Sequence, residues 1–178
     1  MNKKWMIFLL GAAAVLAAAG LLFWRESSRL ELDFSYSGEA LGNPLMGYAP
    51  SAWHDEVAED VTLLYMDITW RELEPEEGVF DWAAIEEENQ LERWRAEGKH
   101  IVLRFLCDLP GEEDHRDIPD WLWEKTGGAG EAYANSYGRG FSPDYSHPEF
   151  IACHQRAVKA LGGRYGGDDF ISFIELGS

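Results

Sequence analysis

The chain has 178 residues, of which 46% are hydrophobic, and its 32 Asp and Glu against 15 Lys and Arg give a formal net charge of −17 at pH 7. Because no basic patch is present to neutralise phosphates, this balance excludes a nucleic-acid partner. The five histidines and two cysteines show no His-x-x-x-His or Cys-x-x-Cys spacing, so the sequence predicts no metal site and no cofactor.

The amino terminus reads as a membrane-targeting segment. Asn2-Lys3-Lys4 precedes an apolar run over residues 5–24, and about twenty such residues are enough to cross a bilayer. We therefore predict a signal anchor, or a cleaved signal peptide, over residues 1–25 and a tether over residues 26–41. Either leader places the remainder outside the cytoplasm, as a single-pass protein of the cell membrane or, if the leader is cleaved, as a secreted one.

Three apolar segments rich in β-branched and aromatic residues predict strands, over residues 61–68, 101–107 and 170–176. Between the first two, helical spacing predicts one helix from residue 83 to about 97, with Asp81 as its N-cap and Gly98 just after its end. Before the third, the pattern Ser146 to Glu149 resembles a capping box that opens another helix.

Alternating strands and helices of this length predict a parallel sheet, either closed as a (β/α)₈ barrel or open and doubly wound. No Gly-x-Gly-x-x-Gly turn follows any of the strands, so nothing in the sequence supports dinucleotide binding.

Two segments carry a resemblance to a known family. Residues 70–82, which begin Trp70-Arg71-Glu72 and end Phe80-Asp81-Trp82, and residues 98–105 look like the second and third βα units of clan A glycoside hydrolases, especially the β-galactosidase-like members. Gly42-Asn43-Pro44-Leu45-Met46-Gly47-Tyr48 is similar to the start of the barrel in a related, largely uncharacterised family of secreted bacterial proteins. The resemblance covers residues 42–178 and implies an α/β fold, a (β/α)₈ TIM barrel.

The resemblance also implies a retaining mechanism, with an acid/base carboxylate at the end of the fourth strand and a nucleophile at the end of the seventh. Counting from Gly47, residues 170–176 are the fourth strand, so Glu175 is the candidate acid/base. The family usually places Asn before this Glu, whereas Ile174 stands here, and a buried or salt-bridged structural Glu175 is the alternative.

Further candidate substrate-binding residues lie near predicted strand ends and in the connection 108–146. Trp70 and Arg104 lie near predicted strand ends, although Arg104 could equally form a salt bridge with Asp67 or Glu175. In the connection, Asp108 could bind sugar hydroxyls, and Trp121 and Trp123 could stack on sugar rings or instead pack the loop down.

The length bears on the interpretation, because a (β/α)₈ barrel takes about 250 residues. Since the sequence ends after its fourth predicted strand, we expect it to be the first half of a barrel, with the apolar side chains of Val102, Phe105 and Phe173 uncovered. An open sheet with its own function is the alternative. Cys107 and Cys153 are expected to be packed, unpaired thiols rather than a disulfide.

These observations predict an exported glycoside hydrolase-like protein that cleaves a β-linked sugar when full length, this chain alone being inactive. The alternative is a barrel without catalysis, serving as a carbohydrate-binding or cell-surface scaffold. A glycan is thus the expected partner, together with the membrane through residues 5–24, and the oligomeric state is not predicted.

Overall fold

The computed structural model describes Leu45 and residues 47–177, all of which belong to the second of the two units into which the chain divides, residues 42–178. The predicted leader over residues 1–25 and the tether over residues 26–41 lie outside the described residues. Within the described part, no helix is both long enough and apolar enough to cross a membrane.

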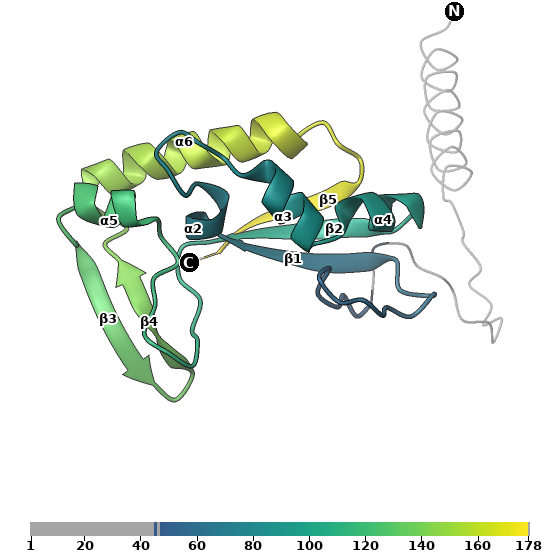
Figure 1. The fold of residues 1–178 in the computed structure, drawn as a ribbon, viewed down its shortest axis with the longest axis horizontal. Helices are drawn as coiled ribbons and strands as arrows, with labels where there is room; N and C mark the ends of the chain where they lie inside the picture. The colour runs from purple at the N-terminus through teal and green to yellow at the C-terminus, as the bar shows by residue number, and fades with distance from the viewer. Residues whose placement is uncertain (1–44, 46, 178) are drawn as a thin grey trace, which may run out of the picture. The chain divides into compact units, whose positions relative to one another are not determined.

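A parallel sheet organises the described part (Figure 1). Strands β1 (Leu63–Thr69), β2 (His100–Leu106) and β5 (Ile171–Gly177) lie side by side in the order β1-β2-β5, and both pairings are parallel. The three predicted strands are therefore confirmed, each within two residues of its expected bounds.

Residues 50–52 extend this sheet beyond β1. The Tyr65 amide donates to the Pro50 carbonyl at 2.8 Å, the Ala52 amide donates to the Tyr65 carbonyl at 2.7 Å, and Ser51 pairs with Tyr65 in parallel. Four chain segments thus lie next to one another in sequence order and in one direction. This is the order that a (β/α)₈ barrel requires, while closure into a barrel stays a prediction.

Helices cover one face of the sheet. They are α2 (Trp70–Leu73), α3 (Trp82–Glu88), α4 (Leu91–Ala96), α5 (Asp120–Lys125) and α6 (Pro148–Tyr165). Alternate residues of the two inner strands are buried in the core that these helices complete: Leu64, Met66, Ile68, Ile101, Leu103 and Phe105. This alternate burial explains why β1 and β2 could be predicted from the sequence, whereas β5 is largely exposed after Ile171 and was predicted from its apolar composition.

The prediction of one continuous helix over residues 83–97 is wrong. Asp81 does cap α3, accepting a hydrogen bond from the Ala84 amide at 3.2 Å, and Gly98 does follow α4 with a φ of 70°. Between α3 and α4, however, Gln90 adopts a left-handed φ of 53°. Its side-chain amide donates to the carbonyls of Trp53 and His54, both at 3.2 Å, so contacts with a distant loop compensate for the break.

The prediction that Ser146 caps α6 is also wrong. The N-cap is His147, whose Nδ1 accepts from the Glu149 amide at 3.2 Å, while the Ser146 side chain instead donates to Asp144 at 2.6 Å. Pro148 occupies the first turn of α6, where its missing N–H costs no hydrogen bond.

The connection between β2 and α6 contains a hairpin that the sequence did not reveal. Strands β3 (Gly130–Asn135) and β4 (Gly138–Pro143) pair antiparallel. All of β3 except Tyr133 is exposed, so it lacks the apolar alternation by which strands are recognised. The hairpin is tied to the loop that follows β2 by two backbone hydrogen bonds between Gly111 and Arg139, at 2.8 and 2.9 Å.

Both cysteines are buried and unpaired, which confirms that prediction. Burial raises the pKa of the Cys107 thiol to about 12, so this thiol is protonated at neutral pH and acts as a small apolar side chain in the core.

Candidate functional site

The sheet face opposite the helices carries a row of polar side chains. Asp67 of β1, Arg104 of β2 and Glu175 of β5 are register partners, and each is the fifth residue of its strand. Tyr65 lies two residues before Asp67, on the same face. We call these four residues the open-face cluster. The parallel register brings together side chains that are far apart in the chain.

Two sets of contacts hold the cluster. Arg104 makes a bidentate salt bridge with Asp67, with Nε–Oδ1 and Nη2–Oδ2 distances of 2.8 Å each. The Tyr65 hydroxyl donates a hydrogen bond to the Glu175 carboxylate, and the Arg104 guanidinium lies 5.4 Å from the centroid of the Tyr65 ring. Arg104 therefore pairs with Asp67, one of the two acids considered, and Glu175 is bound by a phenol instead.

These contacts shift two pKa values. The pKa of Arg104 is raised, chiefly by its hydrogen bond to Asp67, so the guanidinium stays charged. The pKa of Tyr65 is raised, chiefly by its hydrogen bond to Glu175, because ionising the phenol would set two negative charges side by side. The cluster thus combines a fixed cation with a phenolic proton donor beside the Glu175 carboxylate.

The apolar side chains around the cluster are only partly as expected. Phe173 is 50% exposed, which confirms the expectation for that residue. The expectation that Val102 and Phe105 are uncovered is wrong. Phe105 faces the helices and is fully buried, while Val102 is 5% exposed because it lies in register between the larger rings of Tyr65 and Phe173.

Trp70 lies in the core, away from the open-face cluster. Its side chain is fully buried, and its ring packs against Phe105, Phe150 and His154 at centroid distances of 5.5 to 5.8 Å. A sugar cannot stack on a ring that is enclosed on all sides, so we do not retain Trp70 in the proposed site.

A buried carboxylate beside Trp70 was missed. Glu74 precedes Pro75 in an acidic turn whose neighbouring acids Glu76 and Glu77 are exposed, yet its side chain is fully buried. Its carboxylate accepts from Trp70 Nε1 at 2.8 Å and from the Gly78 amide at 2.7 Å. The Glu-Pro sequence predicts a turn correctly, but only the tertiary fold shows that the turn closes over its own acid.

The two candidate tryptophans of α5 are half-buried and packed. Trp121 donates from Nε1 to the Glu74 carbonyl at 2.9 Å, and Trp123 lies under the Arg116 guanidinium, 4.6 Å from the ring centroid. Both therefore help to anchor the loop, and each keeps part of its ring accessible.

Asp108, the second residue after β2, accepts a hydrogen bond from the Tyr133 hydroxyl of the hairpin at 2.6 Å. Burial and this hydrogen bond raise the pKa of Tyr133. Asp108 thereby links the carboxyl end of β2 to the hairpin, and it is half-exposed at the carboxyl edge of the sheet.

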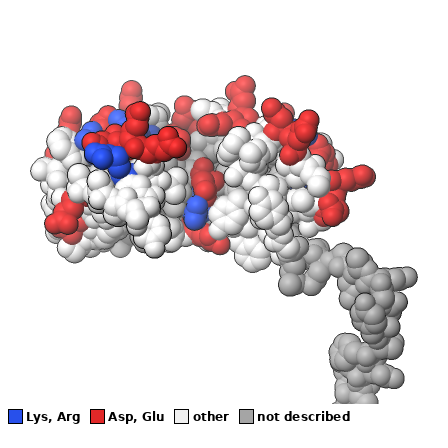
Figure 2. Space-filling model, turned by 90° about the horizontal axis from the view of Figure 1, so that it is seen from below, with Lys and Arg blue, Asp and Glu red and all other residues white. Residues whose placement is uncertain are grey.

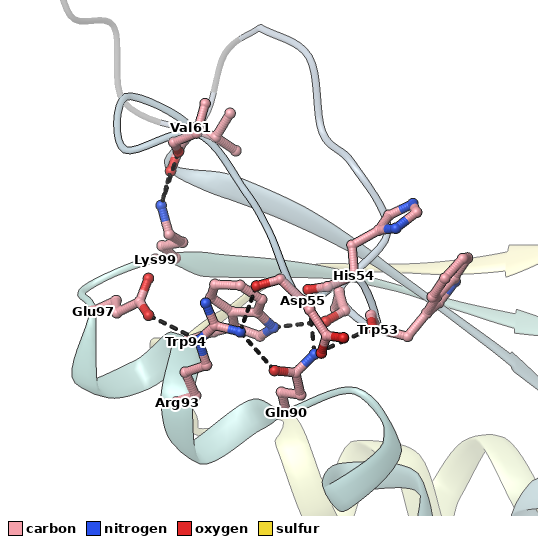
Figure 3. Close-up of polar contacts among 11 residues, drawn as sticks. Trp53, His54, Asp55, Val61, Gln90, Arg93, Trp94, Glu97 and Lys99 are labelled. Atoms are coloured by element: carbon pink, nitrogen blue, oxygen red, sulfur yellow. Dashed lines mark hydrogen bonds and ion pairs between the residues drawn. The ribbon is translucent and has the colours of Figure 1, made fainter.

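A second polar cluster, around α4, is structural (Figure 3). Arg93 Nη1 donates to the Asp55 carbonyl at 2.9 Å, buried Trp94 Nε1 donates to the Ala52 carbonyl at 2.7 Å, and Lys99 Nζ donates to the Val61 carbonyl at 2.7 Å. Because these donors all bind backbone carbonyls of one loop, the cluster fastens residues 52–61 to α4 and to the residue before β2.

Within the described residues, no group of three or more His, Cys, Asp or Glu side chains has a geometry that could hold a metal ion. A scan against protein-family models finds no match to this chain, and a search of the curated proteins finds none either.

Proposed function

We propose that residues 42–178 form four βα units of an exported, glycoside hydrolase-like (β/α)₈ barrel that hydrolyses a β-linked sugar with retention. The single observation that carries this proposal is the row Asp67, Arg104 and Glu175 at one level of three successive parallel strands. In such a barrel this face of the sheet points inward, and active-site residues come from the carboxyl ends of several strands.

Glu175 is the proposed acid/base. It would protonate the departing glycosidic oxygen and, in the second step, take the proton from the attacking water. The Tyr65 hydroxyl donates a hydrogen bond to the Glu175 carboxylate and so helps to orient it. The nucleophile must lie about 5 Å from the acid/base. Asp67 is engaged by Arg104, so we leave the nucleophile to the seventh strand, as the resemblance implies.

The experiment uses the protein at its native length, isolated from its own membrane or medium. We expect nitrophenol release from 4-nitrophenyl β-glucoside or β-galactoside, with the β-anomer of the product forming first in ¹H NMR. Glu175→Gln should lower kcat at least a hundredfold, at the lower end of what general acid–base catalysis supplies.

Leaving-group dependence makes the test specific for an acid. 2,4-Dinitrophenolate leaves a glycoside without being protonated. Glu175→Gln should therefore slow formation of the glycosyl-enzyme far less with a 2,4-dinitrophenyl glycoside than with the 4-nitrophenyl glycoside. Glu92→Gln, on an exposed residue of α4, is the matched control and should change neither rate. Equal losses on both substrates, or a near-wild-type rate, would assign the acid to another residue.

One observation favours a second function, a carbohydrate-binding or cell-surface scaffold barrel without catalysis. On the described part of the open face, the acid nearest in register to Glu175 is Asp67, and its two oxygens are both occupied by Arg104. Retained glycan binding with no turnover of any β-glycoside by the native-length protein would support the scaffold and exclude the enzyme.

A further inference from the structure

The carboxylate of Asp108 has hydrogen-bonding capacity that the protein does not use. Its Oδ1 accepts from the Tyr133 hydroxyl at 2.6 Å, and within residues 47–177 this is the one hydrogen bond that the carboxylate makes. An ionised carboxylate has about four acceptor positions, so Oδ2 is left without a donor. Because Asp108 is half-exposed at the carboxyl edge of the sheet, a ligand can supply that donor.

The Tyr133 hydroxyl provides a second acceptor beside the first. Burial and the hydrogen bond to Asp108 raise the pKa of Tyr133, so the phenol keeps its proton at neutral pH and donates it to Asp108. A phenolic oxygen that donates its proton can still accept a hydrogen bond. Asp108 Oδ2 and the Tyr133 hydroxyl oxygen therefore form a pair of neighbouring acceptors.

The hairpin is built so that the Tyr133 ring can turn toward Asp108. Gly140 on β4 is the register partner of Tyr133 on β3. A Cβ atom at position 140 would lie 2.6 Å from the Tyr133 hydroxyl oxygen and 2.8 Å from its Cζ, so the ring lies over a strand position that has no side chain. A glycine inside a strand weakens the pairing and often marks a close approach. The absence of a side chain at position 140 is thus required by the place that the hydroxyl takes.

A second close approach fixes the hairpin backbone against the loop after β2. A Cβ atom at position 138 would lie 2.7 Å from the Gly111 carbonyl oxygen, and Gly111 exchanges two backbone hydrogen bonds with Arg139. The position of the Tyr133 hydroxyl is therefore set by the hairpin as a whole and not by its own side chain alone.

The ligand that fits two acceptors must bring two donors. Acidic side chains outnumber basic ones in this chain, 32 to 15, and they are spread widely over the face shown in Figure 2. Such a surface disfavours an anion, and the proton of the phenol is already engaged by Asp108. A neutral molecule with two neighbouring hydroxyl groups supplies both donors without adding charge.

We infer that Asp108 and Tyr133 bind two neighbouring hydroxyl groups of a neutral hexose unit, with Tyr133 as the positioning residue that orients the Asp108 carboxylate. The inference rests on the proposed function, which supplies the carbohydrate. It deepens that function by naming the substrate class, a hexoside whose vicinal diol is free, and by giving the β3–β4 hairpin a part in recognising it.

The first test removes only the phenolic hydroxyl, in the protein at its native length. Methyl β-D-glucoside and methyl β-D-galactoside are the probes in isothermal titration calorimetry. Tyr133→Phe should weaken binding of the preferred hexoside about tenfold, as expected for a lost hydrogen bond to a charged group. Tyr137→Phe, in the same hairpin and 87% exposed, is the matched control and should change nothing. Unchanged affinity in Tyr133→Phe, or no binding of either hexoside to the wild type, would overturn the inference.

A second variant tests position rather than chemistry. Gly140→Ala keeps both polar groups but places a methyl group where the Tyr133 hydroxyl lies, so it should weaken binding as Tyr133→Phe does. Gly162→Ala, in α6 with open space around the added atom, is its control. Full affinity in a folded Gly140→Ala would overturn the positioning role. If Gly140→Ala lowers the melting temperature, Tyr133→Phe alone decides.

Monodeoxy analogues of the preferred hexoside identify the diol. Removal of either of two adjacent hydroxyl groups should weaken wild-type binding about tenfold. Both losses should disappear in Asp108→Asn, which replaces one acceptor oxygen with a donor. Losses that persist in Asp108→Asn would place the hydroxyl groups elsewhere. Tighter binding of the 2-amino-2-deoxy analogue would replace the neutral ligand with a cationic one and overturn the assignment.

Kinetics separate this inference from the proposed function. If the protein turns over 4-nitrophenyl hexosides, Tyr133→Phe should raise KM about tenfold and leave kcat within about twofold, because the contact stabilises ground and transition states alike. Turnover with an unchanged KM would overturn the inference and leave the enzyme standing. Hexoside binding that depends on Tyr133, without any turnover, would do the opposite.

Discussion

The two faces of the β1-β2-β5 sheet have different roles. On the helix side, β1 and β2 bury Leu64, Met66, Ile101 and Leu103 completely. On the open side, the same strands and β5 present Asp67, Arg104 and Glu175, which are at least partly exposed. The covered face therefore holds the fold together, and the open face is free to carry charge without a large effect on folding.

The contrast extends to the acids of the two faces. Glu74, behind the sheet, is fully buried and accepts two hydrogen bonds from nearby residues. Glu175 is exposed and has one partner from another strand. A buried carboxylate must be satisfied by its surroundings, whereas an exposed one can exchange its partner for a ligand.

The largest expected effect comes from breaking the covered face. Trp70→Ala removes a fully buried ring from the centre of an aromatic cluster and should lower the free energy of unfolding by about 3–5 kcal/mol. Phe173→Ala, on the open side of β5, is the matched control and should cost under about 1 kcal/mol. Urea unfolding followed by circular dichroism measures both. Equal losses would show that the open face is packed as well.

Glu74→Ala should have the next largest effect. It leaves the Trp70 indole N–H and the Gly78 amide without acceptors, at a cost of about 1–3 kcal/mol. Glu76→Ala, two residues along the same turn and exposed, should be nearly neutral in the same urea titration. A loss under about 0.5 kcal/mol for Glu74→Ala would mean that water replaces the carboxylate.

The salt bridge on the open face should contribute less. Arg104 and Asp67 have side chains 34% and 38% exposed, and pairs of that kind contribute about 0–1 kcal/mol. A double-mutant cycle with Arg104→Met and Asp67→Asn should give a coupling energy in this range. A coupling above about 2 kcal/mol would make the cluster a structural element rather than a site.

The smallest expected effect is a pH dependence of the loop after β2. The carbonyls of Glu113 and Leu109, and the charges of Asp117 and Asp108, raise the pKa of His115 above its usual 6.5. Its stabilisation is thus fully present below pH 6.5 and is lost as the pH rises through the higher, folded-state pKa.

Hydrogen exchange tests this dependence. After correction for intrinsic rates, the Gly111 and Leu109 amides should exchange faster at pH 8.5 than at pH 6, and His115→Asn should abolish the difference. Ile101, in the core strand β2, provides the internal control. Protection that is independent of pH would show that His115 does not hold the loop.

Sequence reasoning succeeded where one segment carries its own signal. The strands, the Asp81 cap and the glycine after α4 follow from local composition, and each is present. Sequence reasoning failed where contacts with a distant segment determine the local conformation. Gln90 breaks a helix because its side chain is bonded to the loop at Trp53, and the hairpin exists because Gly111 and Arg139 tie it down.

The candidate site divides in the same way. Arg104 and Glu175 could be nominated from strand-end positions, but nothing local indicates that Tyr65 donates to Glu175 across two strands. Trp70 was nominated by position as well, and its burial depends on rings contributed by α6. Whether an aromatic residue packs or binds depends on what the rest of the chain places over it.

The sequence by itself determined the three parallel strands, the Asp81 cap and the acidic character of the chain, because these depend on residue type and short-range spacing. The tertiary structure alone decided the register that aligns Asp67, Arg104 and Glu175, the burial of Glu74 and the salt bridge between Arg71 and Asp120. The physical reason is that these features arise from contacts between residues tens of positions apart, whose energies no single segment contains.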